Sequence, residues 1–288
     1  MERAAQPADR MNGSGPVYEE IRDRDAFDAF YAIYAELFPL PDEREPPEAF
    51  VDIMALNNRP DVQERFGPWR EVICAIRLSA GSPIVGGHVF GVTTSPAHLS
   101  FGCRASVQGI YTFLKREARG KGGLHDARSY VTATALETFG FGAEGGRIAP
   151  LIFFEVNNPL RMTAEEIAND KESSGLDPHL RYQFWKRNGF APLDFAYVQP
   201  RLRASAKPVR YLDLFCSTEA GSDIPAELVL AHLKPYVSIS ILKGRDAFDD
   251  PDFRTMANLL APGRRISFVD SGSAEQREIA AQTIAPKA

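Results

Sequence analysis

The sequence predicts an α/β fold, because apolar strand-like runs alternate along it with segments of helical periodicity. Two of the runs, Trp69–Leu78 and Ile84–Val92, are separated only by the turn SAGSP, which is typical of an antiparallel hairpin. A third run, Val107–Leu114, leads through the glycine-rich stretch Arg119–Gly123 into a helical pattern that ends near Phe139. With 288 residues, the chain is long enough to bury a large core.

The N-terminal part predicts a tail, a strand and two helices. Residues 1–16 are small and polar, and we expect a flexible tail there. Val17–Ile21 can open the first strand. Asp23–Phe38 places aromatic side chains at steps of three and four residues, which gives a helix with one apolar face. A proline-rich stretch ends this helix, and Ala49–Leu56 predicts a second helix before a polar loop.

The C-terminal part, from about residue 220, predicts helices but no core of its own. It contains two short helix candidates, and the second has Asp250 as N-cap and Pro251 at its first position. We therefore expect one domain over residues 17–270, followed by a tail over residues 271–288.

Charge and hydropathy exclude several classes of protein. The net charge of −5 disfavours nucleic-acid binding, which needs a basic surface. No apolar run approaches the roughly 20 residues of a membrane span, and the start of the chain lacks the apolar centre of a signal peptide. We expect a cytoplasmic protein with neither a nucleic-acid nor a membrane partner, and the sequence leaves its oligomeric state open.

The three cysteines predict free thiols. Cys74, Cys103 and Cys216 are odd in number and widely spaced, and two of them lie in apolar strand-like runs. Buried thiols in a reducing compartment fit this pattern better than disulfides. No zinc-ligand spacing is present in the sequence, so we expect no metal.

The segment Ser106–Phe139 has the order of parts that builds an anion cradle. A strand that stops at a glycine-rich turn and becomes a helix leaves the first helical N–H groups pointing at a bound anion. Glycines at 120, 122 and 123 let the backbone approach the anion, and Arg119 and Lys121 add charge. The spacing matches neither GxxxxGK[ST] nor GxGxxG, the loops that bind nucleotides.

Three segments together resemble the GCN5-related N-acetyltransferase (GNAT) family: the cradle, the buried run Arg147–Asn157 and LRYQFWKRNGF, Leu180–Phe190. In that family the fourth strand ends in a loop (R/Q)xxGx(G/A) that binds the coenzyme A pyrophosphate, and a helix ending in YxxxGF comes later. The resemblance implies the acyl-CoA N-acyltransferase fold, whose mixed, mostly antiparallel sheet is splayed between strands 4 and 5 and flanked by helices. It also makes residues 159–179 an insertion and makes the last two strand-like runs, APLDFAYVQPRL and VRYLDLFC, a hairpin.

The resemblance assigns acetyl-CoA as co-substrate and indicates which residues hold it. The loop is Arg119, Gly120, Lys121, Gly122, Gly123 and Leu124, with Leu124 where Gly or Ala is usual, and an alternative register begins at Glu117. The Thr112, Phe113 and Leu114 backbone and Asn157 would bond the pantetheine arm, and Trp185 would pack against it. Trp185 stands where the family often has a tyrosine that protonates the thiolate.

Catalysis of amide formation requires a base and an acid. Glu155, near the end of the fifth strand, is the candidate base, although a salt-bridged carboxylate or a water chain is the alternative. Tyr182 lies one helical turn before Trp185 and is the candidate acid, with Tyr197 and Tyr111 as competitors. Any of these tyrosines could instead pack the core.

The acceptor would lie against the first two helices. There the resemblance points to Tyr31, Tyr34 and the acidic loop Asp42–Glu45, in which Glu43 or Glu45 could hold a cationic amine. The predicted function is direct transfer of acetyl from acetyl-CoA to a small-molecule or peptidyl amine. The alternatives are an inactive acyl-CoA sensor, or an enzyme for longer acyl-CoA or for an acyl carrier protein docked on the basic stretch Arg181–Arg210.

Overall fold

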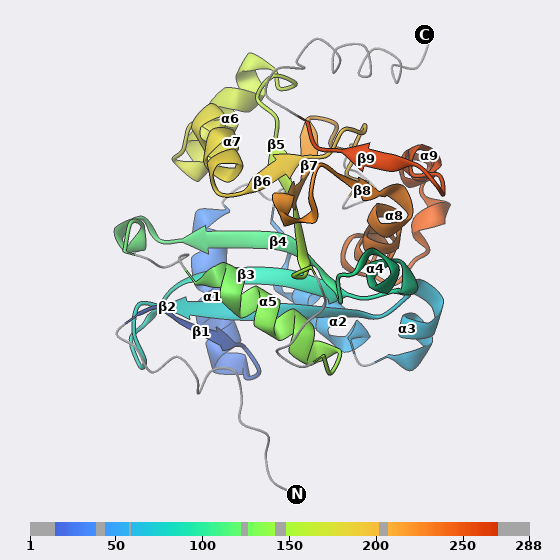
Figure 1. Cartoon of the computed structure of the whole chain (residues 1–288). Coiled ribbons are helices and arrows are strands. Elements are labelled where there is room, and N and C mark those ends of the chain that lie inside the picture. Colours follow the sequence, from blue (N-terminus) through green and yellow to red (C-terminus); the bar gives the residue numbers. More distant parts are fainter. Residues whose placement is uncertain are drawn as a thin grey trace, which may run out of the picture.

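The computed structural model describes residues 15–38, 44–57, 59–121, 126–141, 148–201 and 207–269. Over these residues a central sheet has the strand order β1-β2-β3-β4-β5-β7-β6, and β8 and β9 form a second small sheet (Figure 1). All neighbouring strands are antiparallel except β4 and β5, which are parallel. The predicted α/β fold with a mixed, mostly antiparallel sheet is confirmed.

The sequence predicted the central strands closely. The strands are β1 Val17–Glu20, β2 Trp69–Arg77, β3 Ile84–Thr93, β4 Ser106–Leu114, β5 Leu151–Asn157, β6 Phe190–Pro192, β7 Leu212–Ser217, β8 Asp223–Pro225 and β9 Arg265–Ser267. The α-helices are α1 Arg24–Leu37, α2 Pro47–Leu56, α3 Pro60–Phe66, α4 Pro96–Phe101, α5 Ala127–Thr138, α6 Ala164–Ser174, α7 Pro178–Arg187, α8 Ala226–Pro235 and α9 Pro251–Leu259, and a π-helical segment, η4 Tyr236–Ile241, continues α8.

The parallel strands β4 and β5 part after four pairs. Their register runs from Ser106 opposite Leu151 to Gly109 opposite Phe154 and then stops, although both strands continue. An irregularity in the pairing of β3 with β4 leaves Ile110 without a partner at the same point, and such a bulge bends a strand and increases its twist. The predicted splay between the fourth and fifth strands is therefore present.

The two faces of the sheet are covered by different helices. On one face, α1, α2, α8 and η4 pack against alternate residues of β2, β4 and β5, and on the other face α5 and α7 do so. This alternation follows from the two-residue period of a strand. Side chains of neighbouring positions on β5 therefore belong to opposite faces of the sheet.

The glycines of β3 are required by aromatic rings on one face of the sheet. A Cβ on Gly91 would lie 1.8 Å from Trp69 Cζ2, and one on Gly87 would lie 2.2 Å from Phe30 Cε2. These glycines therefore leave room for the two rings against β3.

Two expectations from the sequence need correction. The polar loop before β2 contains the helix α3, which buries Val62 and Phe66. The run APLDFAYVQPRL is not a long strand, because β6 ends at Pro192 and the Asp194 amide then donates to the Ser267 carbonyl beside the small sheet. The chain after residue 220 shares the largest apolar core with α3 and β5, so it packs as part of the same unit.

Two smaller expectations are confirmed. Cys74, Cys103 and Cys216 are free and buried, and burial raises the pKa of the Cys74 and Cys103 thiols to about 12. Asp250 caps α9 by accepting from the amides of Asp252 and Phe253. Within the described residues, no helix combines the length and apolar character needed to cross a bilayer.

Candidate active site

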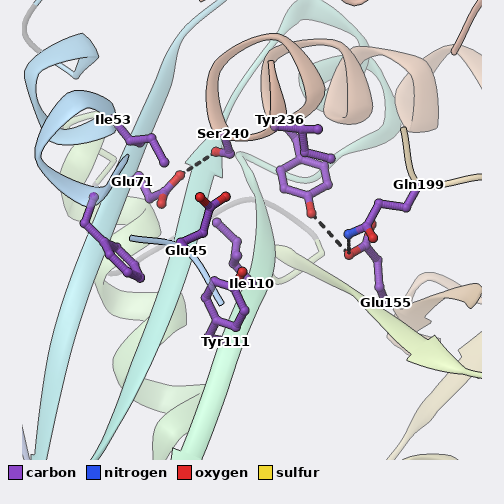
Figure 2. Close-up of a pocket in the computed structure, with 11 residues that line it drawn as sticks. Glu45, Ile53, Glu71, Ile110, Tyr111, Glu155, Gln199, Tyr236 and Ser240 are labelled. Atoms are coloured by element: carbon purple, nitrogen blue, oxygen red, sulfur yellow. Dashed lines mark hydrogen bonds between the residues drawn. The ribbon is translucent and has the colours of Figure 1, made fainter. Parts of the chain in front are cut away.

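A small pocket of about 80 Å³ opens where β4 and β5 part, on the face covered by α2 and η4. Figure 2 shows carboxyl groups from two strands and from the segment before α2 pointing into it. The pocket is lined by Glu45, Phe50, Ile53, Glu71, Ile110, Tyr111, Glu155, Gln199, Tyr236, Ser240 and Ile241. Segments from the start, the middle and the end of the chain therefore build one site.

Glu155 is the first residue of β5 beyond its last pair with β4. Its carboxylate accepts hydrogen bonds from the Tyr197 hydroxyl, from Gln199 Nε2 at 2.8 Å and from the Tyr236 hydroxyl at 3.2 Å. Tyr197 and Tyr236 are buried, and Glu155 itself is partly exposed to the pocket. Three donors thus fix the orientation of one carboxyl group at the point where the strands separate.

The environment makes Glu155 a much weaker acid than an ordinary glutamate. Burial raises its pKa to about 7, although the hydrogen bonds from Tyr197, Tyr236 and Gln199 favour the charged form. A carboxyl group with this pKa can take up a proton near neutral pH, as a general base must.

Glu71 is a second buried carboxyl group in the pocket. It is 2% exposed and accepts from the Ser240 hydroxyl, and burial raises its pKa to about 7. Lys243 lies nearby, with Nζ 3.0 Å from Glu45 Oε1 and 2.6 Å from the Ser240 carbonyl oxygen. Three carboxyl groups therefore face the pocket with one lysine beside them.

Because the pKa of Glu71 is raised, its effect on stability depends on pH. The folded state keeps this proton up to about pH 7, whereas an ordinary glutamate loses it near 4.5. The stability that the raised pKa of Glu71 gives to the folded state is therefore complete below pH 4.5 and is lost as pH rises through 7. We compare the free energy of unfolding of Glu71→Gln with that of the wild type at each pH. This difference should favour the variant by about 2 kcal/mol more at pH 8 than at pH 5. Urea unfolding at both pH values measures this change, and an equal effect at the two values would contradict it.

Of the predicted acceptor residues, Tyr34 lies beside the pocket. Its ring meets that of Tyr111 at 5.1 Å, and its hydroxyl accepts from the Glu45 amide at 3.0 Å. The Tyr31 hydroxyl donates to the Glu45 carbonyl oxygen at 3.1 Å. Both tyrosines thus hold the backbone of Glu45, while Glu43 lies outside the described residues.

Tyr182, the candidate acid, lies on the other face of the sheet from Glu155. Its hydroxyl donates to Asp213 Oδ2 at 2.6 Å, and Asp213 also accepts from Asn158 and forms a 2.6 Å ion pair with Arg161. Trp185 packs its ring 4.5 Å from Phe154, which is the last residue of β5 to pair with β4. Tyr182 and Trp185 are therefore close to β5 on the α7 side.

The predicted coenzyme A loop is described only in part. Arg119 is exposed, and its guanidinium donates to the Leu114 carbonyl at 3.2 Å and to the Ser174 carbonyl at 3.4 Å. Gly120 has φ +75°, a left-handed conformation that favours glycine. Lys121 is exposed, and the remaining predicted loop residues, Gly122, Gly123 and Leu124, lie outside the described residues.

The remaining cofactor candidates lie along the parted strands. The Thr112 hydroxyl contacts His88 Nδ1 at 2.6 Å, Phe113 is buried against Phe30, and Asn157 donates to Asp170 at 3.0 Å. Among the residues that the structure describes, no strand pairs with β4 on its β5 side after Gly109. An extended chain with amide groups, as in pantetheine, fits such an edge, and the exposed Arg119 and Lys121 fit a phosphate at its end.

Sequence reasoning missed Glu71, Tyr236 and Ser240. Glu71 has the same strand phase as the buried residues Trp69 and Ile73 in β2, and a charge among the apolar residues of one face was the one signal available. Tyr236 and Ser240 lie in a segment that gave no sign of function, and Ser240 is 169 positions from Glu71. Only the packing of η4 on the sheet brings them to the pocket.

Comparison with solved structures finds distant similarities. A protein assigned to the GNAT acetyltransferases of Bacteroides thetaiotaomicron is 14% identical, with 79% of this chain and 98% of that chain covered and a TM-score of 0.44. Naa50 of Arabidopsis thaliana, solved with a bisubstrate analogue, is 12% identical, with 70% and 98% covered and a TM-score of 0.39. An aminoglycoside 6′-N-acetyltransferase solved with coenzyme A is 13% identical, with 69% and 94% covered and a TM-score of 0.39.

No protein-family model matches the chain, and no curated protein matches it in sequence. The strand order and the parting of β4 and β5 are seen in this chain itself.

Proposed function

We propose that this protein transfers an acetyl group from acetyl-CoA to an amine of a small molecule or peptide. The observation that carries the proposal is the position of Glu155, whose carboxyl group faces a pocket at the first residue beyond the β4–β5 pairs. An open strand edge, a base with a pKa near 7 and a space for the acceptor meet at this one point.

The chemistry demands little more than these groups. The thioester supplies an activated acyl group, and the amine must be neutral to attack it. Glu155 takes the proton from the ammonium group, while Tyr197, Gln199 and Tyr236 hold the carboxylate in place. Tyr182 and Tyr111 stay as candidates for protonating the thiolate, since Tyr182 is near Trp185 in α7 and Tyr111 lines the pocket.

The pocket favours a cationic acceptor whose amine is carried on an unbranched alkyl group. Glu45 forms an ion pair with Lys243, and Glu71 and Glu155 add negative charge as pH rises through about 7. A pocket of about 80 Å³ suits an aminomethyl group better than a ring. Such an acceptor would arrive as an ammonium ion and lose its proton at Glu155. The three buried thiols fit a reducing compartment, so we place the protein in the cytoplasm.

The test is a thiol-release assay with acetyl-CoA over a panel of monoamines, diamines, aminoglycosides and peptides. We expect release with at least one amine class, with an acid limb near pH 7. Binding of coenzyme A without release by any amine would contradict the enzyme and favour an acyl-CoA sensor. If thiol is released only from a longer acyl-CoA, or only from an acyl carrier protein, then that thioester and not acetyl-CoA is the acyl donor.

Arg119→Ala tests the predicted pyrophosphate contact. Loss of a hydrogen bond to a charged group should weaken coenzyme A binding by about 1.5 to 3 kcal/mol, which calorimetry measures. Arg59→Ala is the matched control, because Arg59 is exposed and pairs with Asp61 near the start of α3. Equal affinity of the two variants would show that the phosphates bind elsewhere.

A further inference from the structure

A buried chain of hydrogen bonds links α4, β4 and α8 beneath the pocket. Ser95 Oγ lies 2.7 Å from His98 Nδ1, and His98 Nε2 lies 2.6 Å from Ser106 Oγ. Ser106 Oγ is also 2.7 Å from His232 Nδ1, and His232 Nε2 is 2.9 Å from Gln108 Oε1. We call these five residues the relay. All of its members except Ser95 are fully buried.

The chemistry of the relay permits one direction of donation. Burial lowers the pKa of His98 to about 4 and that of His232 well below its usual value, so both rings are neutral near pH 7. The Gln108 carbonyl can only accept, so His232 Nε2 donates to it and His232 Nδ1 accepts from the Ser106 hydroxyl. His98 Nε2 then donates to Ser106 Oγ, and Ser95 donates to His98. Every polar atom in the relay has a partner.

This polarity makes the relay a clamp and not a proton path. Gln108 ends it with an amide, which does not take up a proton near neutral pH, and Gln108 Nε2 donates to the Gly109 carbonyl at 3.2 Å. His232 also stacks on Phe153 with ring centroids 4.1 Å apart. The ring is thus fixed between β4 and β5 immediately before these strands part, and buried networks of this kind hold their members in one arrangement.

The same helical segment carries two pocket residues at four-residue steps from His232. Tyr236 donates to Glu155 on β5, and Ser240 donates to Glu71 on β2. Residues four apart lie on nearly one side of a helix, and the π-helical winding of η4 Tyr236–Ile241 is a local irregularity often found at functional sites. His232, Tyr236 and Ser240 therefore attach one helical segment to three different strands.

We propose that His232 is a positioning residue, through which the relay holds α8 and η4 in register with β4 so that Tyr236 can orient Glu155. The proposal deepens the proposed function, because Glu155 is there the base. It does not depend on turnover, since the hydrogen bond from Tyr236 to Glu155 can be measured in the protein without substrates. The hydroxyl of Tyr236 favours the charged form of Glu155, so displacement of η4 must weaken that form.

The test is the pKa of the Glu155 carboxyl group, measured in the full chain by infrared titration and assigned with Glu155→Gln. His232→Phe keeps a ring on Phe153 but removes both relay bonds, and we expect it to raise this pKa by about one unit. Ser106→Ala breaks the relay with the loss of one atom and should also raise the Glu155 pKa. This variant keeps the proposal testable even if His232→Phe fails to fold. The other titratable groups that line the pocket, Glu45, Glu71, Tyr111 and Tyr236, are unchanged in both variants, as are Tyr197, which donates to Glu155, and Lys243, which pairs with Glu45.

Ser217→Ala is the matched control, because Ser217 is also a fully buried serine on a central strand, and its hydroxyl accepts from the Ile152 amide outside the relay. We expect it to lower the melting temperature but not to shift the Glu155 pKa. The double variant Tyr236→Phe/Ser106→Ala should have the same Glu155 pKa as Tyr236→Phe alone, because the relay acts on Glu155 through the Tyr236 hydroxyl. An unchanged pKa in both relay variants, or a further shift in the double variant, would overturn the proposal. Absence of acyl transfer in the wild-type chain would refute the proposed function and leave this measurement intact.

Discussion

Glu155→Gln is expected to lower turnover by about 10²-fold or more, with acetyl-CoA affinity nearly unchanged. The substitution keeps the shape of the side chain but removes its basicity, and this loss is the lower range expected for a general base. In the wild type, Glu155 is charged above its pKa of about 7 and protonated below it. The kcat/KM profile should therefore fall on the acid side of pH 7, and the variant should lose this limb.

Glu71→Gln is the comparison for this result. It removes the other carboxyl group with a pKa of about 7 from the same pocket, but Glu71 lies on β2, away from the parted strands. We expect an acid limb to persist in this variant. If Glu155→Gln kept normal turnover and the same limb, Glu155 would be a structural carboxylate and another group would deprotonate the amine.

Gly91→Val is expected to cost about 3 kcal/mol or more of folding stability. A Cβ at this position would lie 1.8 Å from Trp69 Cζ2, and Trp69 is 2% exposed, so the indole has nowhere to move. Overpacking of this kind is destabilising, and the two further methyl groups of valine increase the clash. Urea unfolding measures the loss.

Gly109→Ala provides the control for Gly91→Val. A Cβ on Gly109 would lie 3.4 Å from Phe154 Cβ, which is an ordinary contact, so stability should stay within about 1 kcal/mol of wild type. Similar losses in both variants would show that Trp69 does not lie against β3 as described.

The sequence predicted those parts of the fold that depend on local pattern. Strand alternation placed β2 and β3 almost to the residue, and the Asp250–Pro251 pair predicted the start of α9. The predicted hairpin is present where β6 pairs with β7, but in the described segment beyond Pro192 the pairing is reduced to isolated bridges of Leu193 with Phe268 and Gln199 with Val209. Tyr197 lies in this irregular segment and reaches Glu155 from there.

Only those residues of the site that stand out within a single segment could be predicted from the sequence. Glu155 stood out as a charge at the end of an apolar strand, and its three donors are 42, 44 and 81 positions away. No periodicity relates residues at such distances. The role of α8 and η4 depends on the core that they share with β5. This core consists of common apolar side chains, and the sequence does not show which of them contact each other.

We propose that the parted edge of β4 and β5 receives the thioester beside Glu155. A crystal structure of the protein with bound coenzyme A would show where the thioester end lies. We expect the pantetheine arm between the two strands beyond Gly109 and Phe154, with its amides bonded to the β4 backbone over Thr112–Leu114, its thiol facing Glu155 and its pyrophosphate at Arg119. Coenzyme A bound at any other place, with the two strands closed on each other, would contradict the claim.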